Sequence, residues 1–206
     1  MHPHLTRRGL YAITDGPRPD LLAAVKAALR GGAAQLQYRD KTADTARRAF
    51  EARALRELCA RFEIPFIVND DVELALAAGA DGVHPGEDDA DIAAARVRLG
   101  AGAIIGVSCY DSLARARQLA AAGADYLAFG AFFPSPTKPN ARRATPKMLR
   151  EAKPLGLPLV AIGGVTPDNA RPLIDAGADF LAVISGIFAQ ADPEAAARRY
   201  AAMYTS

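Results

Sequence analysis

The pentapeptide Ala77-Ala-Gly-Ala-Asp81 returns as Ala121-Ala-Gly-Ala-Asp125 and, with one change, as Asp175-Ala-Gly-Ala-Asp179. A looser version, Gly31-Gly-Ala-Ala34, stands earlier in the chain. Each copy closes a stretch with helical spacing and opens a short apolar run. Glycine adopts the left-handed backbone conformation that ends a helix, and a small residue lets the helix and the next strand pack closely. The repeat therefore predicts a series of helix-to-strand joints and needs no function to explain it.

Eight short apolar runs alternate with helical stretches, at intervals of about 26 residues. Continuous runs with β-branched and aromatic residues are typical of strands that are covered on both faces. Thr45–Arg61 is typical of the intervening helices because it carries an apolar stripe and a charged face. The expected strands are Leu10–Thr14, Ala34–Tyr38, Phe66–Asn69, Gly82–His84, Ile104–Ser108, Tyr126–Gly130, Leu159–Gly163 and Phe180–Ile184.

Eight strand–helix units in 206 residues predict an α/β fold, a parallel eight-stranded (β/α)8 TIM barrel that forms a single domain over residues 1–206. An open, doubly wound sheet is the alternative. It normally has fewer units, and the glycine fingerprint expected after the first strand of its dinucleotide-binding form is absent. No linker or second zone of composition divides the chain.

Composition excludes several classes of protein. The chain has 25 basic and 23 acidic residues, a net charge of +2 that gives no electrostatic footprint for nucleic acid. No apolar run is long enough to span a membrane, and residues 1–10 lack the apolar core of a secretory signal. The two cysteines, Cys59 and Cys109, form no disulfide framework, which favours a reducing cytoplasm. The three histidines are too scattered for a zinc site.

Active sites of such barrels lie at the carboxyl ends of the strands. The seventh expected strand ends in Gly163-Gly164 and the eighth in Ile184-Ser185-Gly186. The loops after these two strands commonly bind phosphate through backbone N–H groups and a helix N-terminus. Ordinary strand-ending turns would look similar, but both loops together favour a phosphate ligand.

The second expected strand runs into Gln37-Tyr38-Arg39-Asp40-Lys41. Alternation along a strand places Gln37, Arg39 and Lys41 on one side, where they can face the mouth of the barrel. Arginine grips phosphate in a fork and lysine acts as a point charge, so this side suits an anion. The alternative is a solvated loop in which Lys41 pairs with a nearby acid.

Carboxylates follow the third and fourth expected strands, in Asn69-Asp70-Asp71 and in residues 87–89. Carboxylates at adjacent strand ends can share a magnesium ion, which also takes phosphate oxygens and water. They have structural alternatives: Asp70-x-x-Glu73 fits a capping box, and Asp88 or Asp89 could cap the helix that starts near Ile92.

Two further loops carry polar groups. Ser108 ends the fifth expected strand, without the histidine and aspartate that a catalytic triad requires. Ser135, Thr137 and Lys138 stand in a proline-stiffened loop after the sixth strand and offer hydroxyls and a cation to an anion. His84 is interpreted as a hydrogen-bonded structural residue, with no assigned role.

The chain resembles the thiamine-phosphate synthase family over nearly its whole length. Seven motifs carry this resemblance, in order and each at a strand end: Gln37-x-Arg-x-Lys41, Val68-Asn-Asp-Asp71, Asp81-Gly-Val-His-x-Gly86 with Asp89, Gly106-Val-Ser108, Gly130-x-x-x-Pro134-Ser-x-Thr-Lys138, Ile162-Gly-Gly164 and Ile184-Ser185. The resemblance implies an enzyme that joins a pyrimidine diphosphate and a thiazole phosphate into thiamine phosphate. It also implies a magnesium cofactor, no nucleic-acid or membrane partner, and a possible homodimer.

The resemblance also implies the site residues. Gln37, Arg39, Lys41 and Asn69 would hold the diphosphate, Asp70 and Asp89 would ligate magnesium, and Ser108 would contact the pyrimidine. Ser135, Thr137 and Lys138 would meet the diphosphate and the phosphate side of the thiazole, and Gly164, Ile184 and Ser185 would cradle the thiazole phosphate. Tyr38, Asp40 and Pro136, which lie within these stretches, are expected to contact substrate as well. Arg39, Lys41, Ser108 and Lys138 are the expected catalytic residues.

The implied reaction is dissociative: diphosphate leaves, and the thiazole nitrogen captures the pyrimidine-methylene cation. Such chemistry needs stabilised negative charge and two aligned substrates rather than a base. Three alternatives stay open. A thiazole tautomerase of the related TenI type would need no diphosphate cradle, a sensor would bind thiamine phosphate without turnover, and a phosphosugar isomerase would need a central acidic base.

Overall fold

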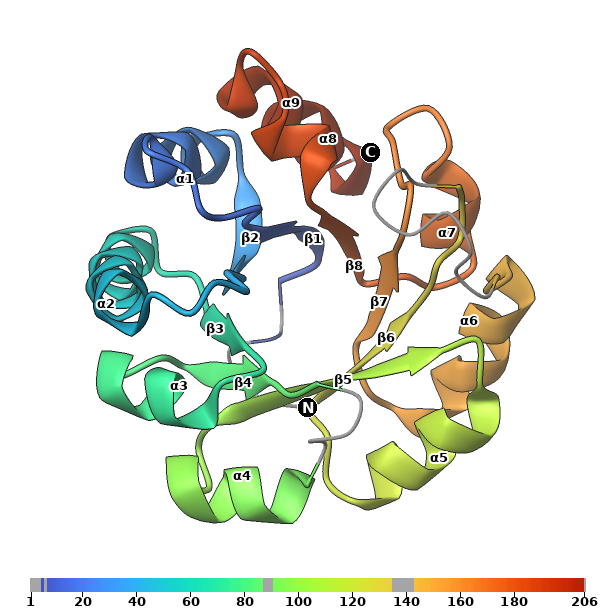
Figure 1. Cartoon of the computed structure of the whole chain (residues 1–206). Coiled ribbons are helices and arrows are strands. Elements are labelled where there is room, and N and C mark those ends of the chain that lie inside the picture. Colours follow the sequence, from blue (N-terminus) through green and yellow to red (C-terminus); the bar gives the residue numbers. More distant parts are fainter. Residues whose placement is uncertain (1–4, 6, 87–90, 135–142, 206) are drawn as a thin grey trace.

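Eight parallel strands close into a barrel in the computed structural model, which describes residue 5 and residues 7–86, 91–134 and 143–205. Each strand pairs with its neighbours in chain order, and β1 closes the barrel against β8 (Figure 1). The strands are β1 (Gly9–Ile13), β2 (Ala33–Tyr38), β3 (Phe66–Asn69), β4 (Gly82–His84), β5 (Ile104–Tyr110), β6 (Tyr126–Phe129), β7 (Leu159–Ile162) and β8 (Phe180–Val183). The expected (β/α)8 barrel is confirmed, with strand ends within two residues of those predicted.

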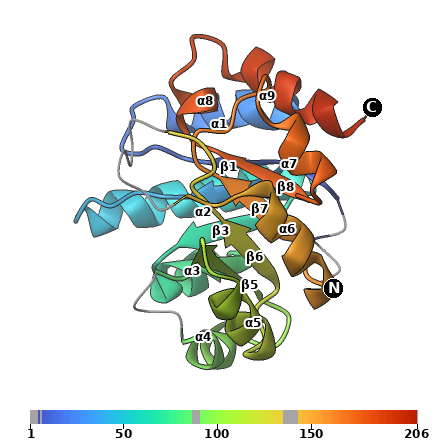
Figure 2. The same cartoon turned by 90° about the vertical axis from the view of Figure 1, so that its right-hand side faces the viewer.

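Helices follow the strands and form a ring outside the barrel (Figures 1 and 2). They are α1 (Leu21–Arg30), α2 (Thr45–Arg61), α3 (Val72–Ala78), α4 (Ile92–Leu99), α5 (Leu113–Ala121), α6 (Pro146–Ala152), α7 (Arg171–Asp175), α8 (Ser185–Phe188) and α9 (Pro193–Ala201), with short 3₁₀ turns at Lys153–Leu155 and Ala202–Tyr204. α2 has the predicted bounds. α8 is a single turn, and α9 is the long helix that follows β8. None of the described helices is both long and apolar enough to cross a bilayer.

Two of the helix caps differ from the sequence prediction. The side chain of Asp71, not Asp70, accepts the backbone N–H of Leu74 and caps α3. Asp70 stands one residue before the cap and has a left-handed backbone, with φ of 62°. The cap of α4 is Asp91, which accepts the backbone N–H of Ala94, instead of Asp88 or Asp89. In both cases the helix starts directly after the capping aspartate.

The repeated pentapeptide is a structural joint, as predicted. Its glycines have positive φ angles, as at Gly79 (63°) and Gly123 (96°). The closing aspartate of each pentapeptide accepts a backbone N–H from the first or second residue of a neighbouring strand: Asp81 from Phe66, Asp125 from Ile105, and Asp179 from Leu159, at 2.8 to 3.0 Å. Each of these aspartates also pairs with an arginine, namely Arg56, Arg96 and Arg8. The repeat thus ties strand starts together at the amino end of the barrel, the end opposite the site.

The hydrophobic core has two parts. One lies between the strands and the ring of helices, and both Cys59 and Cys109 are buried in it as free thiols. The other fills the barrel interior, where Tyr11, Tyr126 and Phe180 are the largest side chains. The Tyr11 ring meets the Tyr126 ring edge-on, at a centroid distance of 5.8 Å. The interior is therefore packed, and a ligand can enter only above it, at the mouth.

Candidate active site

A pocket of about 780 Å³ opens at the carboxyl ends of the strands, and every strand contributes to its lining. Most of the polar groups expected at the site line it, and they come from different strands. The predicted residues found there are Gln37, Arg39, Lys41, Asn69, Asp70, Ser108, Gly164, Ile184 and Ser185. Asp89, Ser135, Pro136, Thr137 and Lys138 lie outside the described residues.

The cationic side of the pocket comes from β2 and the loop after it. Gln37, Arg39 and Lys41 line the cavity, as strand alternation predicts. The structure does not bring the side chains of Tyr38 and Asp40 to the pocket. Both have the opposite phase of the alternation, and their side chains point outward, toward α2.

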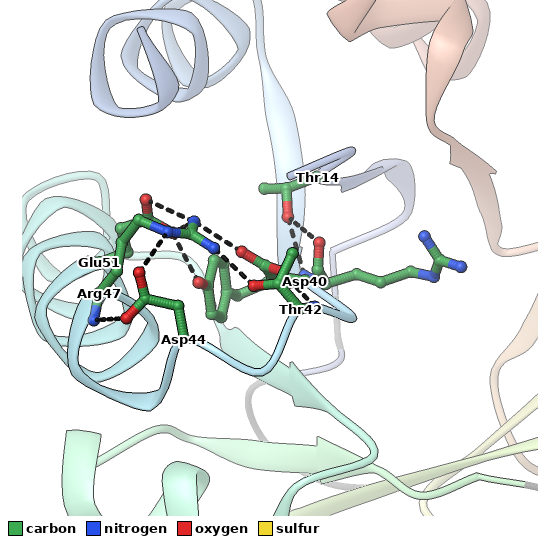
Figure 3. Close-up of polar contacts among 8 residues, drawn as sticks. Thr14, Asp40, Thr42, Asp44, Arg47 and Glu51 are labelled. Atoms are coloured by element: carbon green, nitrogen blue, oxygen red, sulfur yellow. Dashed lines mark hydrogen bonds and ion pairs between the residues drawn. The ribbon is translucent and has the colours of Figure 1, made fainter. Parts of the chain in front are cut away.

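A hydrogen-bonded network anchors these two outward residues, and Figure 3 shows its part around Asp40, Arg47 and Glu51. Tyr38 donates its hydroxyl to Glu51 on α2, at 2.6 Å. On the same helix, Nη1 of Arg47 lies 2.7 Å from Oδ2 of Asp40 and 3.1 Å from Oε1 of Glu51. Burial and the Glu51 carboxylate raise the pKa of Tyr38 well above its usual range, which keeps the phenol protonated as a donor. The network fixes the outward face of the segment whose inward face lines the pocket.

A second anchor holds the backbone of Arg39 directly. The hydroxyl oxygen of Thr14, at the end of β1, accepts the backbone N–H of Arg39 at 2.8 Å (Figure 3). The same hydroxyl donates to the Arg39 carbonyl, at 3.1 Å. Thr14 is fully buried. The sequence pattern marks Thr14 only as the end of a strand, and its role follows from the pairing of β1 with β2.

The acidic side of the pocket is formed by the end of β3. Asn69 and Asp70 line the cavity, and a carboxylate oxygen of Asp70 lies 3.5 Å from Nζ of Lys41. The backbone N–H of Asp70 donates to the carbonyl of His84 on β4, at 2.8 Å. The side chain of Asp71 points away from the pocket, and its Oδ2 lies 2.9 Å from Nη2 of Arg48. The left-handed backbone of Asp70 is what separates the two carboxylates, because it turns one into the pocket and the other to the helix cap.

The donor chemistry of the acidic side fits magnesium. This ion prefers hard oxygen ligands and usually takes one or two carboxylates together with phosphate oxygens and water. Asp70 supplies such a carboxylate, partly exposed and beside the cations that would hold a diphosphate. Within the described ranges, no group of three or more histidine, cysteine, aspartate or glutamate side chains could hold a metal alone. Among the described residues, Asp70 is therefore the one in the pocket lining that could hold such an ion.

The opposite side of the pocket is built from glycine-rich backbone after β7 and β8. Gly163 and Gly164 have φ angles of 98° and 65°, and Ser185 and Gly186 open α8. A Cβ atom on Gly164 would lie 2.4 Å from the carbonyl oxygen of Pro134. Only glycine fits at this position, since it accepts both the conformation and the close approach. Small residues and backbone groups at this edge leave room for a phosphate.

The loop after β6 is tied to this glycine-rich edge. The backbone N–H groups of Phe132 and Phe133 donate to the carbonyls of Ile162 and Gly163, at 3.1 and 2.9 Å. Pro134, the next residue, lines the pocket. The described part of this loop thus ends at the mouth, and Ser135 to Lys138 lie outside the described residues.

The floor of the pocket carries polar side chains to which the sequence pattern assigns no role. Tyr11, Tyr126 and His84 are buried in the barrel interior below Ser108 and Gln37. Burial lowers the pKa of His84 to about 4, so its imidazole is neutral at pH 7. Burial also raises the pKa of Tyr11 and of Tyr126 well above their usual range. The inward strand phase of Tyr11 is the one signal in the sequence that could have identified the floor.

The fold and the site define a class of protein: (β/α)8 barrels whose mouth has a cationic side and a glycine-rich side suited to two anionic groups. A family model described as thiamine monophosphate synthase matches residues 10–187. The chain is 56% identical to thiamine-phosphate synthase of Xanthomonas campestris pv. campestris (strain 8004) over 199 residues, which are 96% of each protein. It is 57% identical to thiamine-phosphate synthase of Thioalkalivibrio sulfidiphilus over 201 residues, 96% of this chain and 95% of the relative.

A solved structure agrees with these relatives. Thiamine phosphate pyrophosphorylase from Pyrococcus furiosus superposes with a TM-score of 0.87 and 35% identity, over 98% of this chain and 96% of that one. The family match and the relatives cover nearly the whole chain. The chain belongs to the thiamine monophosphate synthase family.

Proposed function

We propose that this barrel condenses 4-amino-2-methyl-5-(diphosphooxymethyl)pyrimidine with 4-methyl-5-(2-phosphooxyethyl)thiazole, giving thiamine phosphate and diphosphate. The observation that carries the proposal is the two-sided pocket. Arg39 and Lys41 line one side of this cavity, and the edge formed by Gly163–Gly164 and Ile184–Gly186 lines another. The relatives of the chain are named for this product.

The β2 side would receive the diphosphate of the pyrimidine substrate. Arg39 and Lys41 supply positive charge, and Gln37 and Asn69 supply amide hydrogen bonds beside them. Lys138 would join these cations from the loop after β6. Ser108, which lines the pocket from β5, would contact the pyrimidine ring.

Asp70 and Asp89 would hold a magnesium ion against the diphosphate. The support for Asp70 is its place in the pocket, 3.5 Å from Lys41. When bound, the ion would offset charge on the phosphate oxygens as the diphosphate leaves. The left-handed turn at Asp70 presents the carboxylate for this purpose.

The glycine-rich edge would receive the thiazole phosphate. Gly164 lets the loop after β6 pass close to this edge, and the start of α8 at Ser185 offers a hydroxyl and helix N–H groups. Ser135, Pro136 and Thr137 would close this side from the loop after β6. The two substrates would then meet between the two anion sites, which aligns the reacting atoms.

The proposed reaction needs no side-chain nucleophile. The bond between the pyrimidine methylene carbon and the diphosphate oxygen breaks, and its electron pair leaves with the diphosphate. The thiazole ring nitrogen then forms the new bond to the methylene carbon, and no proton has to be removed. Arg39, Lys41, Ser108 and Lys138 would act by holding the leaving group and the ring, which is electrostatic stabilisation of developing charge.

The alternative functions explain the pocket less well. A thiazole tautomerase has no use for the cationic side at Arg39 and Lys41, and the named relatives are synthases. A phosphosugar isomerase needs a carboxylate base. Within the described lining Asp70 is the one acidic residue, and it lies at the rim beside Lys41. A sensor of thiamine phosphate would have the same pocket and differs from the enzyme in turnover alone.

The test is direct synthesis. The purified chain is mixed with the two substrates and Mg²⁺, and thiamine phosphate is measured by mass spectrometry, with an EDTA control. Product that requires Mg²⁺ would support the proposal. Binding of thiamine phosphate without product formation would replace the synthase by the sensor. Cytoplasmic location and a homodimer belong to the same proposal, and fractionation and light scattering would test them.

A further inference from the structure

Five side chains form an unbroken series of hydrogen bonds across the floor of the pocket. Nε2 of Gln37 donates to the hydroxyl of Tyr11 at 2.8 Å, and the hydroxyls of Tyr11 and Tyr126 lie 2.8 Å apart. The Tyr126 hydroxyl lies 2.9 Å from Nδ1 of His84, and Nε2 of His84 lies 2.9 Å from Oγ of Ser108. The series begins and ends at residues that line the substrate pocket.

The three middle members of this series are buried. Tyr11, Tyr126 and His84 are 1%, 0% and 9% exposed, so water does not compete for their polar atoms. A buried polar atom without a partner is costly, and the bonds inside such a series strengthen one another. Each hydroxyl in the series carries one hydrogen. The direction of one bond therefore determines the direction of the next.

The direction can be followed from Gln37. Because Tyr11 accepts the Gln37 amide hydrogen, its own hydrogen is free for another acceptor. The Tyr126 hydroxyl lies 2.8 Å away and can accept it, so we assign the Tyr11 hydrogen to this bond. The Tyr126 hydrogen is then left for Nδ1 of His84, 2.9 Å away, and this direction makes Nδ1 the acceptor.

A neutral imidazole has one N–H, so an accepting Nδ1 leaves the hydrogen on Nε2. Nε2 then donates to Oγ of Ser108. With its oxygen engaged by His84, Ser108 has its own hydrogen left to donate, and Ser108 lines the pocket. The far end of the series thus presents a hydrogen-bond donor to the ligand.

We propose that His84 is a positioning residue that, as its Nε2–H tautomer, makes the Ser108 hydroxyl a donor toward a ring nitrogen of the pyrimidine substrate. This inference rests on the proposed function for the identity of the ligand. The tautomer itself does not depend on that function. Ring nitrogens of an aminopyrimidine accept hydrogen bonds, so the polarity of the series matches this substrate and disfavours a ring that presents a donor or a C–H at that position.

The sequence provides space for this arrangement. A Cβ atom on Gly106 would lie 1.8 Å from the Tyr126 ring, so glycine at this position of β5 is what admits the tyrosine. Gly106 pairs in register with Tyr126, and Ser108 follows two residues later on the same face. The Gly106-Val-Ser108 stretch thus admits one member of the series and supplies another.

Two substitutions of His84 separate positioning from packing. In glutamine the amide nitrogen can take the place of Nε2 and still donate to Ser108, whereas in asparagine the shorter amide reaches only the place of Nδ1. We expect His84→Asn to raise the KM for the pyrimidine diphosphate about tenfold, the usual effect of one lost hydrogen bond, and to leave the KM for the thiazole phosphate unchanged. His84→Gln should restore most of the loss. In a Ser108→Ala background, His84→Asn should add nothing.

The wild-type protein supplies a measurement that needs no substitution and no turnover. Long-range ¹H–¹⁵N spectra distinguish the two neutral tautomers of histidine, and variants of His2 and His4 assign the His84 signals. The Nε2–H tautomer is the expected result. The Nδ1–H tautomer would overturn the proposal, as would equal effects of His84→Asn and His84→Gln on both substrates. Failure of the wild type to form thiamine phosphate would instead overturn the proposed function, and the tautomer would still be measurable.

Discussion

Nη1 of Arg47 on α2 lies 2.7 Å from Oδ2 of Asp40, a carboxylate whose side chain is fully buried. Asp40 stands between Arg39 and Lys41, the two cations at the mouth of the barrel. The Asp40 carboxylate also accepts the backbone N–H of Thr42, at 2.8 Å. The ion pair therefore fixes, from outside the barrel, the segment that carries Arg39 and Lys41 into the pocket.

Loss of Arg47 should weaken the anion site without touching the substrate. In Arg47→Ala the buried Asp40 carboxylate has no cation, so the loop must shift to expose it. We expect a several-fold rise in the KM for the pyrimidine diphosphate and a lower Tm. Steady-state kinetics with each substrate varied in turn would measure the first, and thermal unfolding the second. Arg53→Ala, on the same helix, is the control and should leave both values near wild type. An unchanged KM in Arg47→Ala would show that α2 does not position Arg39 and Lys41.

The same carboxylate gives a pH dependence of stability. Burial alone would raise the pKa of Asp40, but hydrogen bonds from Thr42 and Arg47 outweigh it and hold the pKa below its usual value. A depressed pKa means that Asp40 stabilises the fold above the pKa of the unfolded chain, about 3.9, and that the contribution is lost as the pH falls through the folded value. Asp40→Asn should lower the free energy of unfolding by about 2 kcal/mol at pH 7. The difference from wild type should shrink below about pH 4 in urea titrations, and a constant difference would contradict the assignment.

Gly164 gives a prediction for the other side of the pocket. Its φ is 65°, and a Cβ atom on this residue would lie 2.4 Å from the Pro134 carbonyl oxygen, so alanine has no room there. Gly164→Ala should raise the KM for the thiazole phosphate at least tenfold and leave the KM for the pyrimidine diphosphate closer to wild type. Gly102→Ala is the matched control, because a Cβ there meets nothing within 4 Å. Equal effects on the two substrates would argue against separate anion sites.

The sequence predicted one side of the site better than its floor. Strand periodicity was enough to place Gln37, Arg39 and Lys41 on one face, because a period of two depends on neighbouring residues alone. The same periodicity places Tyr38 and Asp40 outward, and only their position within a family motif suggested substrate contact. Asp70 was expected as a possible cap because its spacing to Glu73 fits a capping box, but its backbone is left-handed and Asp71 is the cap.

The hydrogen bonds of the floor could not be predicted because they depend on long-range packing. Tyr11 and Tyr126 are 115 residues apart in the chain, and their hydroxyls meet only once the barrel is closed. His84 was interpreted as a hydrogen-bonded structural histidine. It is hydrogen-bonded at both ring nitrogens, and its partners come from β5 and β6. No local pattern in the sequence contains these pairings. The helix-to-strand joints that end at Asp81 and Asp125, in contrast, can be recognised because the same pentapeptide is repeated.

The carboxylate at Asp70 should be essential for turnover through its charge. Asparagine tolerates the left-handed backbone that Asp70 adopts, so Asp70→Asn keeps the loop conformation and removes one negative charge. We expect kcat to fall about a hundredfold or more, as a metal that stabilises a leaving phosphate contributes several kcal/mol. EDTA should abolish wild-type activity, and added Mg²⁺ should restore it. Asp71→Asn is the control, since asparagine also caps a helix, and its kcat should stay near wild type. Equal losses in both variants would assign the effect to the loop instead of the metal.

Gly106 should be the least replaceable glycine of the barrel interior. A methyl group at Gly106 would overlap the Tyr126 ring, which is fully buried and meets both Tyr11 and His84. Because a close-packed interior cannot absorb the added volume, Gly106→Ala should lower the free energy of unfolding by about 3 kcal/mol, measured by urea titration. Adding Tyr126→Phe removes the hydroxyl and keeps the ring, so it should not restore stability. Tyr126→Ala removes the ring, and in the Gly106→Ala background it should cost less than in the wild type, because the new methyl group fills part of the space that the ring leaves. Additive losses in that double variant would show that the two side chains do not compete for the same volume.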